Sequence, residues 1–413
     1  MHGHSRSRLG KGALFGAATA AVLALLTGAA APAGAAPDAT RDAAPGAARD
    51  GHGRTDGGTR LHTPPANPDA YRQIGSLLRD GEYADAARVF RMVRTPQAVW
   101  FTGDDDGRTR QDVRRTVREA DRKDALPVLS LYNVPGRDCA QYSAGGASDT
   151  AEYRAWIDEV VRGIGHRRAL IVLEPDSLAL LPSDCGQDDA EGTLTDARYE
   201  EVRYAVDRLG SLPRTTVYLD AGHSGWHAVG SIVPRLVRAG VEDTRGFYLN
   251  ASNYRSDAEL AWYGTLISGC LSYVAEGGAA ADCPDQWSDR AEARAWLEEQ
   301  VTAGPADRAH YVTDTSRNGR GPWTPPEGEY SDPQDWCNPP DRGLGKRPTT
   351  RTGDPLHDAR LWIKIPGESD GECLRGTEGP EDPERGMVDP PAGAWFPEQA
   401  RELVRFAEPP LFR

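Results

Sequence analysis

The feature that most constrains this chain is a regular alternation of short apolar runs with longer amphipathic stretches. The apolar runs are candidate strands at 98–101, 127–132, 169–174, 215–220, 246–250, 310–314 and 361–365. The amphipathic stretches include 109–122, 151–164, 197–209 and 229–239. Nearly continuous apolar strands that alternate with helices are typical of a parallel sheet covered by helices. We therefore expect an α/β fold, with a parallel β/α barrel in a single domain.

Nearly every candidate strand ends in a polar or acidic residue. These residues are Glu174 with Asp176, Asp220, Asn250, Asp314, and Lys364 with Asp370. In β/α barrels the chemistry sits at the carboxyl ends of the strands. The pattern predicts a site at this end of the barrel, rich in carboxyl groups.

Composition excludes one large class of partner. The chain has 48 Lys and Arg against 62 Asp and Glu, a formal net charge of −14, so we expect no binding to nucleic acid. The hydrophobic content of 38% and the 10 Trp are compatible with a folded core. We find no phosphate-cradling glycine loop, no HExxH and no His/Asp metal spacing, and we expect neither metal nor cofactor.

The N-terminus predicts export. Basic residues precede an apolar run at 13–26, and Ala33-Gly34-Ala35 supplies the small residues of a cleavage site, so residues 1–36 are predicted to be a secretory signal peptide. A membrane anchor is the alternative, but the run is short for a span. Residues 37–65 are predicted to be a flexible leader and 66–413 the single catalytic domain. No later stretch resembles a membrane span, and we expect a secreted monomer.

Six cysteines follow the signal, as suits an oxidising exterior. Six allow 15 connectivities, and the sequence alone does not choose among them. The plausible pairs of sequence neighbours are Cys139–Cys185, Cys270–Cys283 and Cys337–Cys373. A zinc site is the rival interpretation, but CxxC spacing is absent and few His are in reach.

Two aspartates stand where an apolar strand gives way to a turn. Asp138 follows a Pro-Gly turn in LYNVPGRDCA, and Asp176 follows Pro175 in IVLEPDSLAL. Each has an ordinary structural interpretation, as a turn or helix cap. A carboxyl group at the end of an apolar strand is, however, also where desolvation raises a pKa and keeps a proton available.

Two further segments supply groups that suit a polar, flat ligand. VYLDAGHSGW approaches the GxSxG nucleophile elbow, but Trp226 replaces the second Gly, which argues against a serine esterase using Ser224. Asp220, His223 and Trp226 are better suited to binding a ligand.

LWIKIPGESDGEC places Lys364, Glu368 and Asp370 around a turn directly after a strand, where they line a cleft unless they form a solvated surface cluster. With Trp100, Trp226 and Trp336 as aromatic platforms, the set fits sugars. Hydrolysis of a glycosidic bond by paired carboxylates is the reaction it indicates.

Taken together, seven strings resemble glycoside hydrolase family 6, the family of endoglucanases and cellobiohydrolases. They are LYNVPGRDCA, IVLEPDSLAL, YLDAGHSGW, NASNY, DTSRNG, WCNP and WIKIPGESDG, in the family's order between about residues 66 and 400. The resemblance implies a distorted, partly open β/α barrel with a substrate groove across its top. It also implies inverting hydrolysis of β-1,4-glucan without metal or cofactor.

The resemblance implies a role for each of three carboxyl groups. Asp176 looks like the general acid, and Asp138 resembles the second carboxylate, which keeps Asp176 protonated and helps organise the attacking water. Asp370 is similar to the residue proposed as general base, although water relays the proton in a competing view. Inversion implies roughly 6.5–9.5 Å between acid and base.

Further matches concern binding and disulfides. Tyr132 matches the residue beneath the distorted sugar. Residues that match stacking platforms are Trp100, Trp226 and Trp336, and residues that match hydroxyl-binding positions are Asp220, Lys364 and Glu368. The predicted binding set also includes His223, from VYLDAGHSGW, and Asn250, at a strand end. The family's two bacterial disulfides correspond to Cys139–Cys185 and Cys337–Cys373, whereas Cys270–Cys283 rests on proximity and parity alone.

Departures from the family's exo-acting pattern favour internal cleavage. The first of the two loops that roof the groove of exo-acting members corresponds to 140–152, which is short and rich in Gly and Ser. The second, 374–392, is long and polar and could cover one end. Val229 stands where some exo-acting members carry a further Trp. We expect an endoglucanase, with a cellobiohydrolase of the same family and a non-catalytic glucan-binding barrel as alternatives.

Overall fold

The computed structural model describes residues 58–103 and 107–412. The predicted signal peptide, 1–36, and residues 37–57 of the predicted leader lie outside this part of the chain. None of the helices in the described ranges is long and apolar enough to cross a membrane.

The described residues form one parallel sheet of seven strands that follow each other in sequence order. The strands are β1 (Val99–Phe101), β2 (Val128–Leu131), β3 (Ala169–Leu173), β4 (Thr215–Asp220), β5 (Gly246–Leu249), β6 (His310–Asp314) and β7 (His357–Leu361). Among the described residues no strand pairing joins β1 to β7. One backbone hydrogen bond, from Ala98 N to Trp362 O at 2.8 Å, spans the opening instead. The predicted α/β fold, a partly open parallel barrel, is confirmed.

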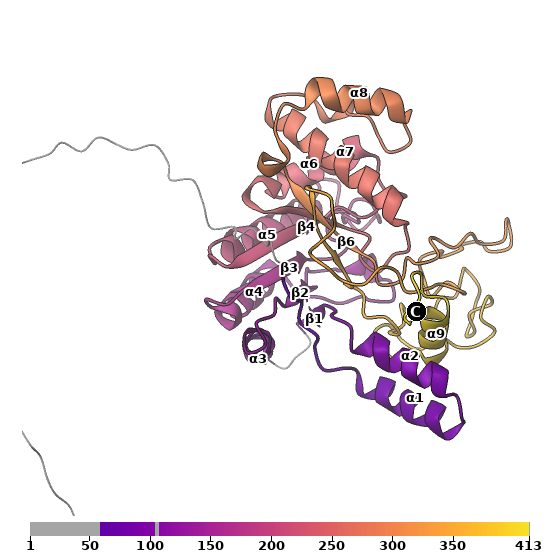
Figure 1. Ribbon diagram of the computed structural model, residues 1–413. Helices are drawn as coiled ribbons and strands as arrows, with labels where there is room; N and C mark the ends of the chain where they lie inside the picture. Colours follow the sequence, from indigo (N-terminus) through magenta and orange to yellow (C-terminus); the bar gives the residue numbers. More distant parts are fainter. Residues whose placement is uncertain (1–57, 104–106, 413) are drawn as a thin grey trace, which may run out of the picture. The chain divides into compact units, whose positions relative to one another are not determined.

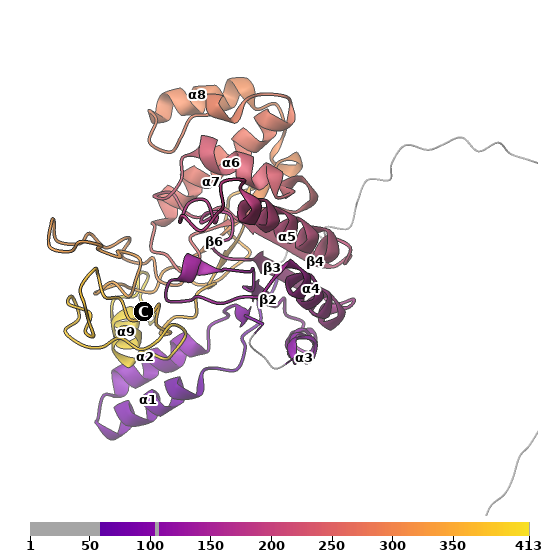
Figure 2. The same cartoon turned by 180° about the vertical axis from the view of Figure 1, so that it is seen from behind.

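Helices surround this sheet (Figures 1 and 2). They are α1 (Pro68–Arg79), α2 (Tyr83–Val93), α3 (Thr109–Asp121), α4 (Thr150–Ile164), α5 (Thr193–Gly210), α6 (Val229–Arg238), α7 (Asp257–Ala275), α8 (Arg290–Gln300) and α9 (Pro397–Arg405). The four stretches predicted from amphipathic spacing correspond to α3, α4, α5 and α6. The N-terminal pair α1 and α2 packs beside the C-terminal α9 and shares a buried cluster with it.

The last strand lies four residues earlier than the sequence predicts. Residues 361–363 are buried, but the run does not continue the ladder beyond Leu361, because the N–H groups of Ile363 and Lys364 donate to the Asp314 carboxylate (3.2 and 2.9 Å). The strand is instead HDARL, whose polar residues hide it from a search for apolar runs. The prediction at 361–365 was therefore wrong, because a side chain takes the place of a strand partner.

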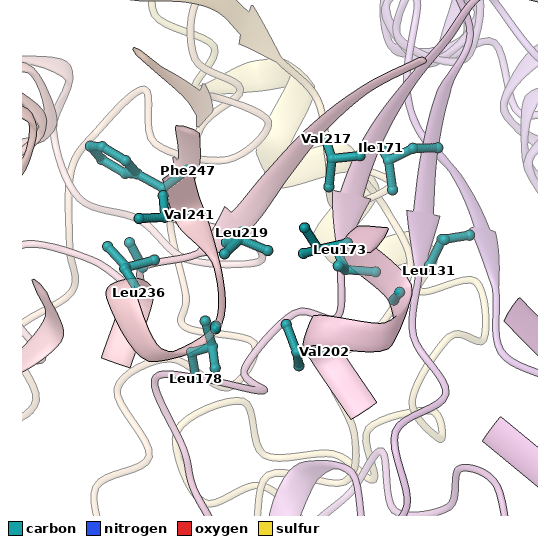
Figure 3. Close-up of a cluster of buried hydrophobic side chains, with 14 of the residues drawn as sticks. Leu131, Ile171, Leu173, Leu178, Val202, Val217, Leu219, Leu236, Val241 and Phe247 are labelled. Carbon is teal, nitrogen blue, oxygen red and sulfur yellow. The ribbon is translucent and has the colours of Figure 1, made fainter. Parts of the chain in front are cut away.

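Alternate residues of the strands separate into two cores, as the two-residue period of a strand requires. Leu131, Leu173 and Leu219 point toward the surrounding helices, where they meet residues such as Val202 (Figure 3). Residues of the opposite parity, including Val172 and Tyr218, form a second cluster with Val312 of β6. Because both faces are apolar, the polar groups at the strand ends are confined to the rim.

The segment 58–65, which the sequence places in the leader, contacts the barrel. Leu61 forms a bridge with Leu126 just before β2, and the N–H of His62 donates to Leu126 O (2.9 Å). Leu61 and His62 are buried, and Leu61 belongs to the cluster inside the barrel. The ordered barrel thus begins a few residues before Pro65.

Candidate active site

The carboxyl ends of the strands carry an unusual concentration of left-handed backbone. Non-glycine residues with positive φ include Asp138 (57°), Glu174 (50°), Asp176 (67°), Asn250 (71°) and Ser252 (58°). Such conformations are uncommon outside glycine, persist only where surrounding contacts impose them, and cluster at functional sites. All five lie on the loops that follow β2, β3 and β5.

The loop after β3 holds Asp176 in place through a carboxylate of the neighbouring strand. Asp220, at the end of β4, accepts hydrogen bonds from the N–H groups of Leu178 (3.2 Å) and Ala179 (2.9 Å). Its other oxygen accepts from Gly222 N (3.0 Å). Asp220 is only 2% exposed. This geometry favours a positioning role over the predicted contact with a sugar hydroxyl.

Asp176 is partly exposed and lies in an environment that opposes its ionisation. Burial raises its pKa well above the usual range, and the neighbouring Asp220 and Asp138 raise it further. Burial also raises the pKa of Asp220, but three backbone N–H donors favour its charged form. Of Asp176 and Asp220, Asp176 is therefore the one that keeps its proton.

Asp138 faces Asp176 from the loop after β2. Its Oδ2 accepts from Ser143 N (2.7 Å), and the side chain is partly exposed. Burial raises the pKa of Asp138, while Ser143 and the adjacent Arg137 act in the opposite direction. The structure thus brings together the predicted general acid, Asp176, and Asp138, the carboxylate predicted to keep it protonated.

Two buried residues join the loops that carry this pair. Glu174 Oε2 accepts from Asn133 N (2.7 Å) and Val134 N (3.0 Å). Arg198 of α5 donates to Ser177 O (3.1 Å) on one loop and Pro135 O (2.8 Å) on the other. Sequence reasoning assigned neither residue a role, because the partners are about 20 to 60 residues away in the chain.

Tyr132 lies at the bottom of the same region. It is 6% exposed, and burial, followed by Asp176 and Asp138, raises its pKa, which places the ring beside both carboxyl groups. Trp100 contacts it edge-on with ring centroids 5.4 Å apart. The Trp100 indole donates to Ile363 O (2.8 Å), so this aromatic pair stands at the opening between β1 and β7.

Asp370 occupies a quite different environment in the loop after β7. Arg317 donates to its Oδ2 (2.7 Å), and Lys364 Nζ lies 3.2 Å from its Oδ1. Asn338 N (3.0 Å) and the Tyr254 hydroxyl (3.4 Å) also donate to Oδ2. Burial raises the pKa of Asp370, but Arg317 and Lys364 outweigh it and hold the pKa below the usual range. Asp370 is therefore ionised.

The remaining predicted binding residues fall into two groups. Lys364, Glu368, His223, Trp226 and Trp336 are partly exposed, as a ligand contact requires. Asn250, by contrast, is fully buried and its amide joins Asp314 O (2.9 Å) to Arg255 N (2.9 Å). This geometry favours a role for Asn250 in shaping the loop after β5.

Local contacts fix the chemistry of the partly exposed set. Burial, with help from Arg255 and His227, lowers the pKa of His223 to about 3, so His223 is neutral and its Nδ1 accepts from Gly225 N. Glu368 accepts from Asn67 at the start of α1 (3.0 Å), and burial raises its pKa. A neutral imidazole and a hydrogen-bonded carboxyl group suit a hydroxyl-rich ligand.

Sequence reasoning missed three residues that contact Asp370: Arg317, Tyr254 and Asn338. Arg317 is fully buried, stacks over the Tyr254 ring at 4.4 Å and also donates to Ser252 O. Asn338 is fully buried as well. The strings DTSRNG and WCNP contain Arg317 and Asn338, and the position of Arg317 just after a buried strand was the available signal.

All three predicted disulfides are present: Cys139–Cys185, Cys270–Cys283 and Cys337–Cys373. Cys139 directly follows Asp138, and Cys373 stands three residues after Asp370. Two of the three disulfides therefore restrain loops that carry candidate catalytic carboxyl groups.

Within the described ranges one group of side chains has the spacing of metal ligands: Cys373, Asp382 and Asp389. Cys373 is bound to Cys337, and Asp382 forms a fully buried ion pair with Arg375 (2.8 Å). These partners leave the group unsuited to a metal ion.

Comparison with known proteins agrees with this geometry. The model of the family Glycosyl hydrolases family 6 matches residues 56–407. Endoglucanase A of Cellulomonas fimi is 35% identical over 324 residues, 78% of this chain and 57% of that protein. A probable 1,4-beta-D-glucan cellobiohydrolase C of Neosartorya fischeri is 32% identical over 304 residues, 68% of this chain and 62% of that one.

A solved structure extends the likeness to the fold. The endoglucanase Cel6 of Mycobacterium tuberculosis, determined with a methyl-cellobiosyl thio-cellobioside, has a TM-score of 0.65 and 34% identity, covering 85% of this chain and 98% of that one. The present chain spans less than two thirds of the length of its Cellulomonas fimi relative. The match across nearly the whole described barrel establishes that this chain belongs to glycoside hydrolase family 6.

Proposed function

We propose that the protein is an inverting glycoside hydrolase that cleaves internal bonds of β-1,4-glucan. The observation that carries this proposal is the opposite charge state of two carboxyl groups at one rim. Asp176 retains a proton because burial and two carboxyl neighbours disfavour its anion. Asp370 is an anion because a buried Arg317 and Lys364 surround it. An acid and a base with separated pKa values are what general acid–base hydrolysis requires.

In the proposed reaction, Asp176 gives its proton to the glycosidic oxygen as the bond from that oxygen to the anomeric carbon breaks. A water attacks the anomeric carbon from the opposite face, and the anion of Asp370 finally receives that water's proton. Because three donors occupy Oδ2 of Asp370, whereas Oδ1 has Lys364 Nζ at 3.2 Å, we assign Oδ1 as the atom that receives the proton. Asp138, beside Asp176, keeps the acid protonated and orients the water.

Stereochemistry tests the reaction directly. Proton NMR of fresh cellotetraose digests resolves the anomers of the new reducing end before they equilibrate. The proposal expects the α anomer first, since one displacement inverts a β bond. A β anomer as first product would contradict inversion. If no β-1,4-glucan yields new reducing ends, the protein is not a glucanase and the non-catalytic glucan-binding barrel is favoured instead.

Loop structure supports internal cleavage. The segment 140–152 folds back on the preceding loop: Ala147 N donates to Asn133 O (3.0 Å), and Arg137 donates to Ser143 O (2.9 Å). Loop 374–392 is held by Arg375 and Arg385, which donate to backbone oxygens of residues 333–339. Side chains thus anchor both loops to neighbouring backbone, and the Tyr142 hydroxyl, which accepts from Leu374 N (3.0 Å), joins the two loops at one point. The shortness of the segment 140–152 is the feature that favours an open cleft.

The viscosity of carboxymethylcellulose, plotted against new reducing ends, separates internal from terminal cleavage. An endoglucanase lowers viscosity steeply for each bond cut. Slow thinning, with cellobiose as the main soluble product, would instead favour the cellobiohydrolase alternative. The esterase alternative has little support, since Ser224 is 6% exposed and its hydroxyl has no hydrogen-bond partner among the described residues.

We also propose that the protein is exported and acts as a monomer. Three disulfides that use all six cysteines suit an oxidising compartment. N-terminal sequencing of protein recovered from a culture medium tests the predicted removal of residues 1–36, and sedimentation velocity tests the monomer. Retention of the full N-terminus in the cells, or a dimer, would contradict these proposals.

A further inference from the structure

A buried asparagine, Asn338, connects loop 374–392 to Asp370. Asn338 donates its N–H to Asp370 Oδ2 (3.0 Å), and its Oδ1 accepts from Asp370 N (2.9 Å). Asn338 therefore grips both the carboxylate and the backbone of Asp370. It does so with a left-handed backbone, φ 38°, which only firm contacts on all sides can hold.

The amide nitrogen of Asn338 is in turn oriented by three acceptors. Nδ2 lies within hydrogen-bond distance of Ser369 Oγ (2.9 Å), Gly371 O (2.9 Å) and Asp389 Oδ2 (2.8 Å), and its two hydrogens are shared among these three acceptors. Ser369 and Gly371 flank Asp370 in the chain. Asp389 is the one acceptor that comes from the far end of loop 374–392, and it is 1% exposed. The amide orientation of Asn338 thus depends on a carboxyl group outside the proposed reaction.

The same loop supports the backbone of this segment. Arg385 donates to Asn338 O (2.8 Å) and Arg375 to Cys337 O (2.9 Å). Arg375 is itself neutralised by Asp382 (2.8 Å). Loop 374–392 is therefore built around residues 337–339, which explains why Arg375, Asp382 and Arg385 turn inward although the segment is polar.

We propose that Asp389 is a positioning residue for Asp370, acting through Asn338, and that loop 374–392 thereby helps to hold the candidate base in place. This inference rests on the proposed function for its kinetic consequences. Its structural content, the dependence of Asp370 on Asp389, stands apart from activity.

The electrostatics of Asp389 indicate which variant should preserve the contact. Burial raises the pKa of Asp389 to about 7, with Asp382 acting in the same direction and Asn338, Arg385 and Arg375 opposing it. Below that pH Asp389 is a neutral acid, and its Oδ1 has no partner among the described residues. An asparagine matches that form: one oxygen can still accept from Asn338, and an NH₂ replaces the hydroxyl.

The test compares Asp389→Ala, Asp389→Asn and Glu381→Gln. Glu381 lies exposed on the same loop, so Glu381→Gln controls for the loss of one carboxylate. In Asp389→Ala we expect kcat on cellotetraose to fall about tenfold with KM within about twofold, because a mispositioned base slows the reaction without removing sugar contacts. Asp389→Asn and Glu381→Gln should stay within about twofold of the parent at pH values of about 5 to 6.

The pH dependence distinguishes positioning from general loss of structure. Besides Asn338, the groups that face Asp370 are Arg317, Lys364 and Tyr254, and none of them changes in these variants. Without Asp389 the Asn338 side chain loses an acceptor, and a shift of this residue should weaken the hydrogen bond from its backbone N–H to Asp370 Oδ2. The pKa of Asp370 should then rise, so the acid limb of the pH profile of kcat should move up by about half a pH unit in Asp389→Ala. An acid limb that stays in place, or an equal shift in Asp389→Asn, would overturn the inference.

A carboxyl carbon NMR titration of Asp370, assigned by comparison with Asp370→Asn, gives the same answer without substrate. A higher pKa in Asp389→Ala than in the parent supports the inference even if the parent hydrolyses no glucan. An unchanged pKa in a folded Asp389→Ala overturns it even if the proposed function holds.

Discussion

The rim above β3 and β4 and the rim above β6 and β7 each present an aspartate, and the two differ in what surrounds them. Around Asp176 the neighbours that shift its pKa are the carboxyl groups of Asp220 and Asp138. Around Asp370 they are Arg317 and Lys364. Both groups are removed from bulk water, so the sign of the neighbouring charge decides which of them ionises. One side chain type thus supplies both an acid and a base.

The supports of the two regions differ as well. Asp176 is held indirectly, through backbone N–H groups that bind Asp220. Asp370 accepts hydrogen bonds on its own carboxylate from Arg317, Asn338 and Tyr254. The first arrangement leaves the Asp176 carboxyl free to transfer a proton, and the second stabilises a fixed anion. The comparison concerns the pH profile of kcat. Substitutions around Asp176 should move its alkaline limb, where the acid loses its proton, and substitutions around Asp370 should move its acid limb, where the base gains one.

The largest effect is expected from Asp176→Asn, which removes the proton donor and retains the shape. We expect kcat on carboxymethylcellulose to fall by about a thousandfold, within the range of a lost general acid. Binding of cellotetraose, measured by calorimetry, should persist. Asp207→Asn, an exposed carboxylate on α5, is the matched control and should retain full activity. Activity of Asp176→Asn near that of the control would refute the acid assignment.

A smaller but more diagnostic effect is expected from Asp220→Asn. The substitution removes a negative neighbour, so the pKa of Asp176 should fall and the alkaline limb should move to lower pH by about one unit. The acid limb should not move. Because an amide NH₂ would face either Gly222 N or the N–H groups of Leu178 and Ala179, kcat should also fall about tenfold. An unchanged alkaline limb would show that Asp220 does not tune the acid.

The corresponding substitution near Asp370, at the rim above β6 and β7, is Arg317→Gln. Loss of the buried cation should raise the pKa of Asp370 and move the acid limb to higher pH, leaving the alkaline limb in place. Because the buried Asp370 carboxylate then keeps only Lys364 as a cationic partner, the free energy of unfolding in urea should fall by about 3 kcal/mol. Movement of the alkaline limb instead would break the assignment of the two limbs to the two regions.

The smallest effect concerns stability. Burial raises the pKa of Glu174 from its ordinary value of 4.5 to about 7. The folded chain therefore holds a proton there that the unfolded chain releases, and stability should fall as pH rises through this window. The slope should be about 1 kcal/mol per pH unit at most. Glu174→Gln, which keeps the acceptor for Asn133 and Val134, should flatten it, and an unchanged slope in this variant would show that the slope comes from another group.

The comparison also explains what the sequence could reveal. Strands such as 169–173 and the acids that end them carry local signals, because apolar runs and turns are written in adjacent residues. The environment of Asp370 is different: Arg317, Asn338 and Tyr254 lie roughly 30 to 120 positions away. Asp220 and Asn250 look like binding residues in sequence, but their hydrogen bonds turn inward. The predicted position of β7 was wrong because of a contact between distant residues: the Asp314 carboxylate takes the place of a strand partner for residues 363 and 364.

The central claim is that Asp176 is a neutral acid in the resting enzyme. Infrared difference spectroscopy between the parent and Asp176→Asn, recorded at about pH 6, measures this state through the C=O band of a protonated carboxyl group. We predict that the band is present in the parent and fades only well above the usual pKa of an aspartate. A carboxylate signal at this position throughout the active pH range would contradict the claim.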